Sequence, residues 1–317
     1  MNATDRTPFG ATGLMMSRLG IGGGSLASAA GEAGVKAVVD AAWDAGLRYF
    51  DTAAYYAGGE SERRLGLALR DRPRDAYVLG TKTGRYLLPD GTDRFDYSAA
   101  GTEATIRTAL ARLHTDRLDL VFIHDVQPSL HGEAYEAQHA MALKGALPVL
   151  QRLKAAGVIG AVGVAMRDPW PILRLLKEAP FDAVMLAGGC TLLHQEACEA
   201  LLPHCVATGT PVLFAAPFET GILATGAIPG ARYRYKPAPQ DLMARTAAIE
   251  AACARHGVTL AAAAMRFPLL CQAVKGVVVG HQAPGELARN LALMQAEIPA
   301  ALWEELRATG LVSTLPR

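Results

Sequence analysis

The sequence predicts an α/β protein, a (β/α)8 TIM barrel with an amino-terminal hairpin and long loops at one face. Apolar runs of strand length alternate along the 317 residues with segments in which apolar residues recur at helical spacing. Eight such repeats without a break in composition favour a closed parallel barrel over an open sheet. Three consecutive expected strands also end in an ionisable side chain: Asp51, Lys82 and His124. Because the carboxyl ends of barrel strands meet at one rim, these side chains are expected close together.

The individual elements follow from this alternation. The expected strands are residues 19–24, 48–51, 76–81, 118–123, 159–164, 182–186, 211–215 and 276–279. The expected helices are residues 35–45, 61–70, 102–114, 145–156, 169–178, 196–207, 240–256, 260–267, 284–294 and 300–309. Glycines at 10 and 13 predict a turn between the hairpin strands 7–9 and 14–16. Long rim loops, which usually have a function, are expected at 84–100, 125–141 and 217–239.

Composition restricts the class of protein. Hydrophobic residues make up 51% of the chain and charged residues 19%, which suits one domain with a large core over residues 1–317. The formal net charge is +1 and no basic stripe interleaved with aromatics occurs, so nucleic acid is not an expected partner. No apolar run reaches the roughly 18 residues of a membrane helix. The first residues do not form a signal peptide, and a cytoplasmic protein is expected.

Neither the cysteines nor the glycines after the first strand decide the chemistry. The five cysteines contain no Cys-x-x-Cys pair, and the preferred interpretation is buried small hydrophobes. Cys198, Cys205 and His194 could share one helix face as a metal site, but no metal is expected. Gly23 and Gly24 follow the first strand without the helix of a dinucleotide fingerprint. They either let a ligand approach the backbone or serve as turn residues.

The ionisable strand ends suit proton transfer when a tyrosine joins them. The loop after Asp51 supplies Tyr55 and Tyr56. A phenol has an ordinary pKa of about 10, and a nearby Lys82 ammonium held by Asp51 favours its ionised form. A neutral His124 could donate a hydrogen bond to the same substrate oxygen. Taken singly, each residue has an ordinary structural interpretation. Together they predict acid–base chemistry at a carbonyl or carbinol oxygen.

The order and spacing of these residues resemble the catalytic tetrad of the aldo-keto reductase superfamily, whose members are NAD(P)-dependent barrel enzymes. The tyrosine of that pattern comes five residues after the aspartate, which selects Tyr56 over Tyr55. The matching stretches are Asp51-Thr52-Ala53, Gly58-Gly59-Glu60, Gly80-Thr81-Lys82-Thr83-Gly84-Arg85 and Ile123-His124-Asp125. The resemblance implies that Asp51, Tyr56, Lys82 and His124 are catalytic. It also implies a small-molecule substrate and a nicotinamide cofactor.

Three further stretches resemble one branch of that superfamily, the sugar 1-dehydrogenases acting on L-fucose, D-arabinose and L-galactose. They are Thr81–Tyr86, His124-Asp125-Val126 and the segment from Gly221 to Tyr233. The resemblance implies oxidation of an anomeric hydroxyl to a lactone, with Tyr56 as the base. The branch includes pyridoxal 4-dehydrogenases, and a general aldehyde or ketone reductase is a further alternative. A cofactor-binding, redox-sensing subunit is the alternative from a different class, although the intact tetrad favours an enzyme.

The resemblance also implies a cofactor site, in which this chain departs from the common pattern. Ala165-Met166 replaces a Ser-Asn pair, and Ala215 stands where many relatives stack an aromatic on the nicotinamide. Glu286 replaces a phosphate-binding arginine, which favours NAD over NADP, although His281 and Arg289 could rescue NADP. The expected cofactor contacts are Gly23, Gly24, Asp51, Ala165, Met166, Ala215, Pro217, Phe218, Gly221, Val279, Gly280, Gln282, Glu286 and Asn290.

Overall fold

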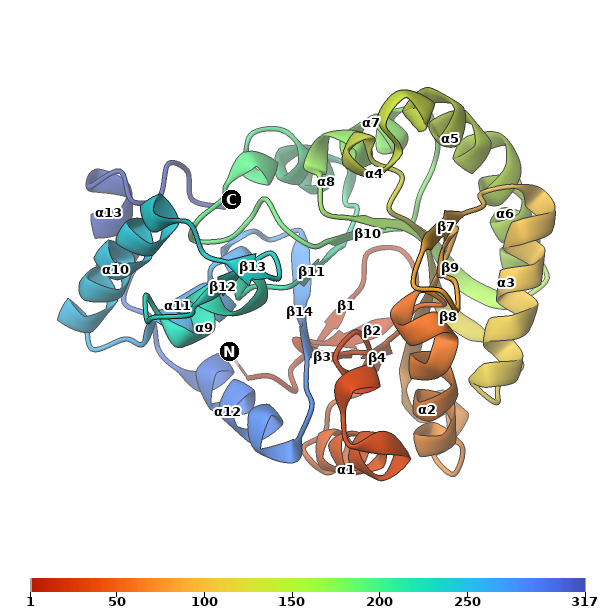
Figure 1. Cartoon of the computed structure of the whole chain (residues 1–317), viewed down its shortest axis with the longest axis horizontal. Helices are drawn as coiled ribbons and strands as arrows, with labels where there is room; N and C mark the ends of the chain where they lie inside the picture. Colours follow the sequence, from red (N-terminus) through yellow and green to blue (C-terminus); the bar gives the residue numbers. More distant parts are fainter. Residues whose placement is uncertain (1, 317) are drawn as a thin grey trace.

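The computed structural model describes residues 2–316, and its centre is a closed barrel of parallel strands surrounded by helices (Figure 1). Around the barrel the strand order is β3, β4, β5, β8, β9, β10, β11 and β14, which returns to β3. This is the eight-stranded barrel that the sequence predicts. The strands are β3 Leu19–Gly22, β4 Tyr49–Asp51, β5 Val78–Thr83, β8 Leu118–His124, β9 Ile159–Met166, β10 Ala183–Leu186, β11 Val212–Ala215 and β14 Val274–Gly280.

Helices cover the outside of the barrel. Some begin at side-chain caps, as where Ser98 accepts a hydrogen bond from the Gly101 amide and Asp168 accepts one from the Trp170 amide. In Figure 1, α10 and α13 lie together at the periphery, beyond the helices that face the strands. The helices are α1 Gly31–Asp44, α2 Glu60–Leu69, α3 Ala99–Arg112, α6 Leu147–Ala155, α7 Pro169–Glu178, α8 Leu201–Thr208, α10 Gln240–Arg255, α11 Leu260–Arg266, α12 Pro284–Gln295 and α13 Ala300–Ala308.

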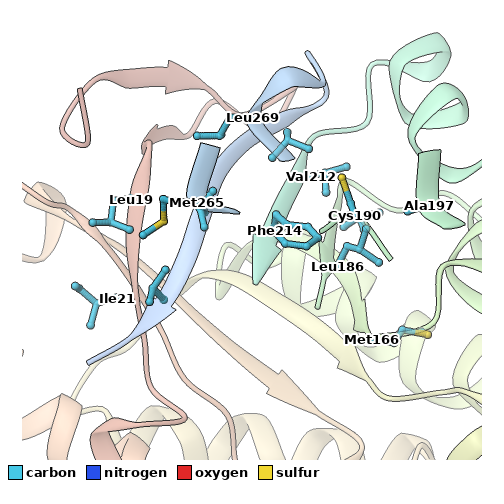
Figure 2. Close-up of a cluster of buried hydrophobic side chains, with 14 of the residues drawn as sticks. Leu19, Ile21, Met166, Leu186, Cys190, Ala197, Val212, Phe214, Met265 and Leu269 are labelled. Carbon is cyan, nitrogen blue, oxygen red and sulfur yellow. The ribbon is translucent and has the colours of Figure 1, made fainter. Parts of the chain in front are cut away.

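Two apolar clusters hold these layers together. The larger one fills the space between strands and helices, and Figure 2 shows part of it, including Phe214 and Leu186. The smaller one fills the barrel interior and contains Tyr49 and Phe122. The antiparallel hairpin of β1 (Arg6–Pro8) and β2 (Met15–Ser17) adds the fully buried Phe9 and Met16 to this inner cluster. The hairpin is confirmed, and its apolar side chains cover the amino-terminal end of the inner cluster.

The three expected rim loops contain more secondary structure than the sequence predicts. Residues 84–100 form a two-stranded hairpin of β6 (Arg85–Leu87) and β7 (Asp93–Phe95). The expectation of a loop at 125–141 is wrong, because helical segments occupy most of it: α4 Pro128–His131, a short 3₁₀ turn, α5 Tyr135–Met141 and a π-helical turn that continues into α6. The stretch 217–239 contains α9 (Ile222–Thr225) and paired strands β12 (Arg232–Tyr233) and β13 (Lys236–Pro237).

The other boundaries shift by a few residues. The helix α1 begins at Gly31, four residues before its expected start, and α8 begins at Leu201, after a separate 3₁₀ turn at Glu196–Cys198. The alternating order of strands and helices is unaffected, so the predicted strand ends still meet at one rim. Within residues 2–316, no helix has both the length and the apolarity needed to cross a membrane.

Candidate active site

Strand register directs the three ionisable strand ends into the mouth of the barrel. Side chains alternate between two faces along a strand. Tyr49 and Phe122 belong to the interior cluster, and Asp51 and His124 lie two residues further along the same strands. Lys82 lies four residues after the interior residue Val78 and therefore has the same orientation.

Asp51 and Lys82 form a buried ion pair at the bottom of this mouth. The Lys82 ammonium donates to Asp51 Oδ2 at 2.5 Å and to the Thr52 carbonyl at 2.8 Å. Tyr49 donates from its hydroxyl to the other carboxylate oxygen of Asp51, at 3.3 Å. Burial alone lowers the pKa of Lys82, but the Asp51 charge and Tyr56 oppose it, and the net pKa is raised. The amine is therefore a fixed cation at neutral pH.

Tyr56, and not Tyr55, is the phenol beside this pair. The Lys82 ammonium lies 4.9 Å from the centre of the Tyr56 ring. Tyr55 instead accepts a hydrogen bond from Arg85 at 3.0 Å, and the guanidinium also stacks on its ring. The two rings stand at 69° to each other and both lie edge-on to His124, so the contacts with Lys82 and with Arg85 distinguish them.

An unusual backbone turn fixes the position of Tyr56. The three residues after it, Ala57, Gly58 and Gly59, all have positive φ angles of 51°, 63° and 92°. Arg112 of α3 donates to the Gly58 carbonyl at 3.2 Å and contacts the buried carboxylate of Glu62 at 3.1 Å. The φ angle of 92° at residue 59 strains any residue with a Cβ, and that Cβ would also displace the Arg112 guanidinium, so the turn favours glycine there.

His124 completes the cluster as a neutral imidazole. Its ring lies edge-on to Tyr56, with 6.1 Å between the ring centres and an angle of 88°. Burial, opposed by Asp125, lowers the pKa of His124 to about 4. The imidazole can therefore donate one hydrogen bond without carrying charge, as expected. We call Asp51, Tyr56, Lys82 and His124 the quartet.

One electrostatic expectation needs correction. Burial raises the pKa of Tyr56 and outweighs the opposing effect of Lys82, so the net shift is upward. The phenol is therefore protonated at neutral pH, where we had expected it to ionise more readily. Lys82 limits the cost of forming the phenolate, but it does not bring the pKa of Tyr56 down to neutrality in this environment.

A second cluster, next to the quartet, was missed in the sequence. Arg85 donates to Asp125 Oδ2 at 2.6 Å, to Asp93 at 2.5 Å and to Tyr55. The sequence offered one signal, a second carboxylate directly after His124, but its partner Arg85 comes from another strand. We call Tyr55, Arg85, Asp93 and Asp125 the Arg85 cluster.

Most of the expected cofactor contacts lie at or after the ends of β11, β14 and β3, which are consecutive around the barrel, and β3 pairs directly with β4 of the quartet. The others lie on β4 itself (Asp51) and at the end of β9 (Ala165 and Met166), which pairs with β8. Gly23 follows β3, and its amide donates to the Asp51 carbonyl at 2.6 Å. A Cβ on Gly24 would stand 3.9 Å from the Tyr56 ring, in van der Waals contact, so this glycine lies directly beside the phenol.

The structure does not bring every expected cofactor residue into the mouth. The side chains of Met166 and Val279 belong to the outer core, so they can present only backbone to a ligand (Figure 2 labels Met166). Ala165, the residue before Met166, and Ala215 at the end of β11 instead pack at the barrel interior. Pro217, Phe218 and Gly221 follow β11, in a segment with four positive φ angles at 216 and 219–221.

The polar groups in the segment after β14 form hydrogen bonds with one another. Glu286 accepts a hydrogen bond from the Gln282 amide at 2.7 Å, at the start of α12. One carboxylate oxygen holds the turn and the other is available to a ligand. Asn290 contacts His281 at 3.1 Å, and both are buried. Asn290 therefore fixes His281 and is not displayed at the surface.

The cysteines serve as packing. All five are buried, and Cys190 lies in the outer core in Figure 2. Burial raises the pKa of Cys205 to about 12, so this thiol stays protonated. Across residues 2–316, no group of three or more His, Cys, Asp or Glu side chains is arranged to hold a metal ion.

A closed barrel with a buried carboxylate–ammonium pair, a phenol and a neutral imidazole at its mouth defines an oxidoreductase built for proton transfer at a substrate oxygen. The chain belongs to the Aldo/keto reductase family, whose model matches residues 18–310. It is 37% identical to a D-threo-aldose 1-dehydrogenase from Pseudomonas sp, over 96% of this chain and 97% of the relative. It is 32% identical to a pyridoxal 4-dehydrogenase from Microbacterium luteolum, over 99% of both chains.

A solved structure supports the fold. The holo form of an aldo-keto reductase from Bacillus halodurans superposes with a TM-score of 0.79 at 23% identity, covering 99% of this chain and 98% of that one. The family uses a nicotinamide cofactor, as predicted.

Proposed function

We propose that the protein is an NAD-linked aldose 1-dehydrogenase, which oxidises the anomeric hydroxyl of a sugar of the L-fucose, D-arabinose or L-galactose type to a lactone. The convergence of the quartet in one open mouth is the observation that carries the proposal. The relative named D-threo-aldose 1-dehydrogenase, at 37% identity over nearly the whole of both chains, supports the substrate class.

Within this proposal Tyr56 accepts the proton of the substrate hydroxyl. Its phenol lies beside the Lys82 ammonium, which stabilises the phenolate that must form before the proton is taken. Asp51 keeps the ammonium in place through the 2.5 Å contact. His124, neutral and edge-on to Tyr56, donates a hydrogen bond to the substrate oxygen and so holds it next to the phenol.

The open rim beside Tyr56 would hold the cofactor. Gly24 lies beside the Tyr56 ring and has no side chain to obstruct a ligand, and the segments after β11 and β14 would hold the rest of the cofactor through backbone groups and the free oxygen of Glu286. The nicotinamide supplies hydride acceptance at carbon when it is bound. Glu286 supports NAD over NADP, because a carboxylate repels a 2′-phosphate but accepts a hydrogen bond from a ribose hydroxyl.

The relative named pyridoxal 4-dehydrogenase supports a second candidate, because it is 32% identical over 99% of this chain. Pyridoxal also presents a hydroxyl on an oxidisable carbon, so the quartet would act on it in the same way. The two candidates differ only in the contacts around the reacting carbon.

A substrate screen in the oxidising direction, at mildly alkaline pH and with NAD and NADP separately, tests the proposal. The panel contains L-fucose, L-galactose, D-arabinose and pyridoxal, and formation of reduced cofactor is followed by absorbance. We expect turnover of at least one aldose with NAD. Turnover of pyridoxal alone would favour the second candidate. Measurable cofactor binding without turnover of any substrate would instead favour a redox-sensing binding subunit.

A further inference from the structure

Asp125 is held rigidly at the rim with its carboxylate directed at His124. Its φ angle is +61°, a left-handed conformation that aspartate tolerates better than most residues. Its amide donates to the Ala165 carbonyl at 2.9 Å, and its own carbonyl accepts from the Gln127 amide at 3.0 Å. The His131 ring nitrogen Nε2 also contacts that carbonyl, at 3.0 Å. These contacts fix the backbone before any ligand arrives.

The Asp125 carboxylate is only half used. Oδ2 accepts from Arg85 at 2.6 Å and lies 3.5 Å from His124 Nε2. Within residues 2–316, no hydrogen-bond donor reaches Oδ1, and this oxygen is not completely buried. The residue is 8% exposed. A carboxylate oxygen thus remains available next to the imidazole that we assign to the substrate hydroxyl.

Arg85 restricts the orientation of the Asp125 carboxylate and thereby the position of Oδ1. The guanidinium contacts Asp125 and Asp93 together, donates to the Tyr55 hydroxyl, and stacks 3.9 Å from the centre of the Tyr55 ring. A bridge of this kind leaves little rotational freedom to the Asp125 side chain. The free oxygen is therefore a preorganised acceptor.

The charges of the quartet and the Arg85 cluster do not cancel. The quartet and the Arg85 cluster contain three carboxylates, those of Asp51, Asp93 and Asp125, and two cations, those of Lys82 and Arg85. His124 is neutral, so one negative charge is left over. A neutral compound with several hydroxyl donors suits this charge, whereas a sugar phosphate or a sugar acid would be repelled.

We propose that Asp125 is a specificity-determining residue that accepts a hydrogen bond from a second hydroxyl of the substrate, and that the Arg85 cluster thereby selects neutral polyhydroxy compounds. This inference rests on the proposed function for the reacting hydroxyl, but it concerns a different contact. A substrate without a neighbouring hydroxyl gains nothing from Asp125. A hydrogen bond to a charged acceptor is worth about 1.5–3 kcal/mol, or roughly 10- to 150-fold in affinity.

Two small aldehydes measure this contact directly, because glyceraldehyde differs from propanal only in its hydroxyl groups. Asp125→Asn is the informative variant, because asparagine tolerates the same left-handed backbone and has nearly the same shape. We expect it to lower kcat/KM for glyceraldehyde about tenfold or more relative to propanal, in the reducing direction. Discrimination against glyceraldehyde 3-phosphate should also weaken. Asp116→Asn, an exposed aspartate in the turn before β8, removes the same charge at the closed end and should change neither ratio.

Each result has a definite consequence. An equal loss for both aldehydes would overturn the proposal, because Asp125 would then act only through His124. Loss of discrimination in a protein that oxidises no aldose would support this contact while contradicting the proposed function. An unchanged ratio of the two kcat/KM values, in a protein that does oxidise aldoses, would contradict the Asp125 contact while supporting the proposed function. If neither aldehyde is reduced, calorimetry with D-arabinitol decides: weaker binding to Asp125→Asn supports the proposal, and equal binding overturns it.

Discussion

The ammonium of Lys82 lies 2.5 Å from the carboxylate of Asp51, and neither side chain is more than 3% exposed. Two opposite charges are therefore buried together at the open end of an apolar barrel. Burial of such a pair rarely stabilises a protein compared with apolar packing. Its retention here is explained by the phenol of Tyr56, whose ionised form needs a fixed cation at this place.

This relationship predicts separate effects on stability and activity. Lys82→Met should leave Asp51 buried and unpaired and lower the free energy of unfolding by about 3–5 kcal/mol. Adding Asp51→Asn should restore most of that stability, because the remaining buried charge is removed. Both variants should be inactive, because neither has an ammonium next to Tyr56. Denaturant unfolding and steady-state kinetics check this together. Recovery of turnover in the double variant would contradict the role given to Lys82.

The raised pKa of Tyr56 predicts opposite pH profiles for the two reaction directions. Oxidation needs the phenolate, so kcat/KM should increase with pH up to and beyond about 10, the ordinary value for tyrosine. Reduction needs the protonated phenol and should decline over the same range. His124 has a pKa of about 4 and should give no inflection between pH 6 and 8. A bell-shaped profile centred near neutrality in both directions would refute this assignment.

The buried His281 should make the folded protein less stable in mild acid. Burial lowers the pKa of His281 to about 4 from its ordinary 6.5, so its stabilising effect is complete above pH 6.5 and is lost as the pH falls towards 4. In this window the residue contributes a slope of about 1.4 kcal/mol per pH unit. His281→Gln should remove that slope. Unfolding experiments at pH 7, 5.5 and 4.5 measure it, and parallel curves for both proteins would exclude the effect.

Glu286 predicts the cofactor preference. Glu286→Arg should raise kcat/KM for NADP relative to NAD at least tenfold, because it replaces a repelling carboxylate by a cation that binds phosphate. Glu286→Gln removes the charge alone and should give a smaller change. Both substitutions disturb the hydrogen bond to the Gln282 amide, so that effect is common to the pair. A wild-type enzyme that already prefers NADP strongly would show that the 2′-phosphate is held elsewhere.

The turn after Tyr56 predicts a difference between two glycines. Gly59→Ala should lower the free energy of unfolding by about 1–3 kcal/mol and reduce turnover, because the new methyl group displaces Arg112 and shifts the turn. Gly91→Ala is the matched control, since its φ is also positive, at 83°, but no atom lies within 4 Å of the new Cβ. It should cost about 1 kcal/mol and spare turnover. Equal effects in both variants would mean that the Arg112 contact is unimportant.

The sequence predicted the barrel because its signals are local. The apolar period of each strand and the polar residue at each strand end survive any shift of a helix boundary, and register then places Asp51, Lys82 and His124 together. The rim insertions were harder to predict, because the helices of residues 128–141 have no long apolar stripe. The Arg85 cluster could not be predicted, since its contact with the quartet depends on the ion pair of Arg85 and Asp125, which are 40 positions apart in the sequence.

The pKa of Tyr56 is the property for which the sequence-based expectation and the structure differ most clearly. From the sequence, Lys82 should make Tyr56 more acidic, which is the correct sign for that one interaction. Burial has the opposite effect and is larger, and its extent depends on how the rim packs around the ring. The effect of a charged neighbour on a pKa can thus be predicted from the sequence more easily than the effect of burial.

Turnover of Tyr56→Phe, compared with Tyr55→Phe, tests the central claim most directly. Both variants lose one hydroxyl from adjacent rings, but only Tyr56 lies beside Lys82. We expect Tyr56→Phe to lose at least about a thousandfold in kcat, consistent with loss of a general base, while its cofactor affinity stays nearly unchanged. Tyr55→Phe should lose less than tenfold. Near-normal turnover in Tyr56→Phe would show that another group handles the proton and would contradict the account.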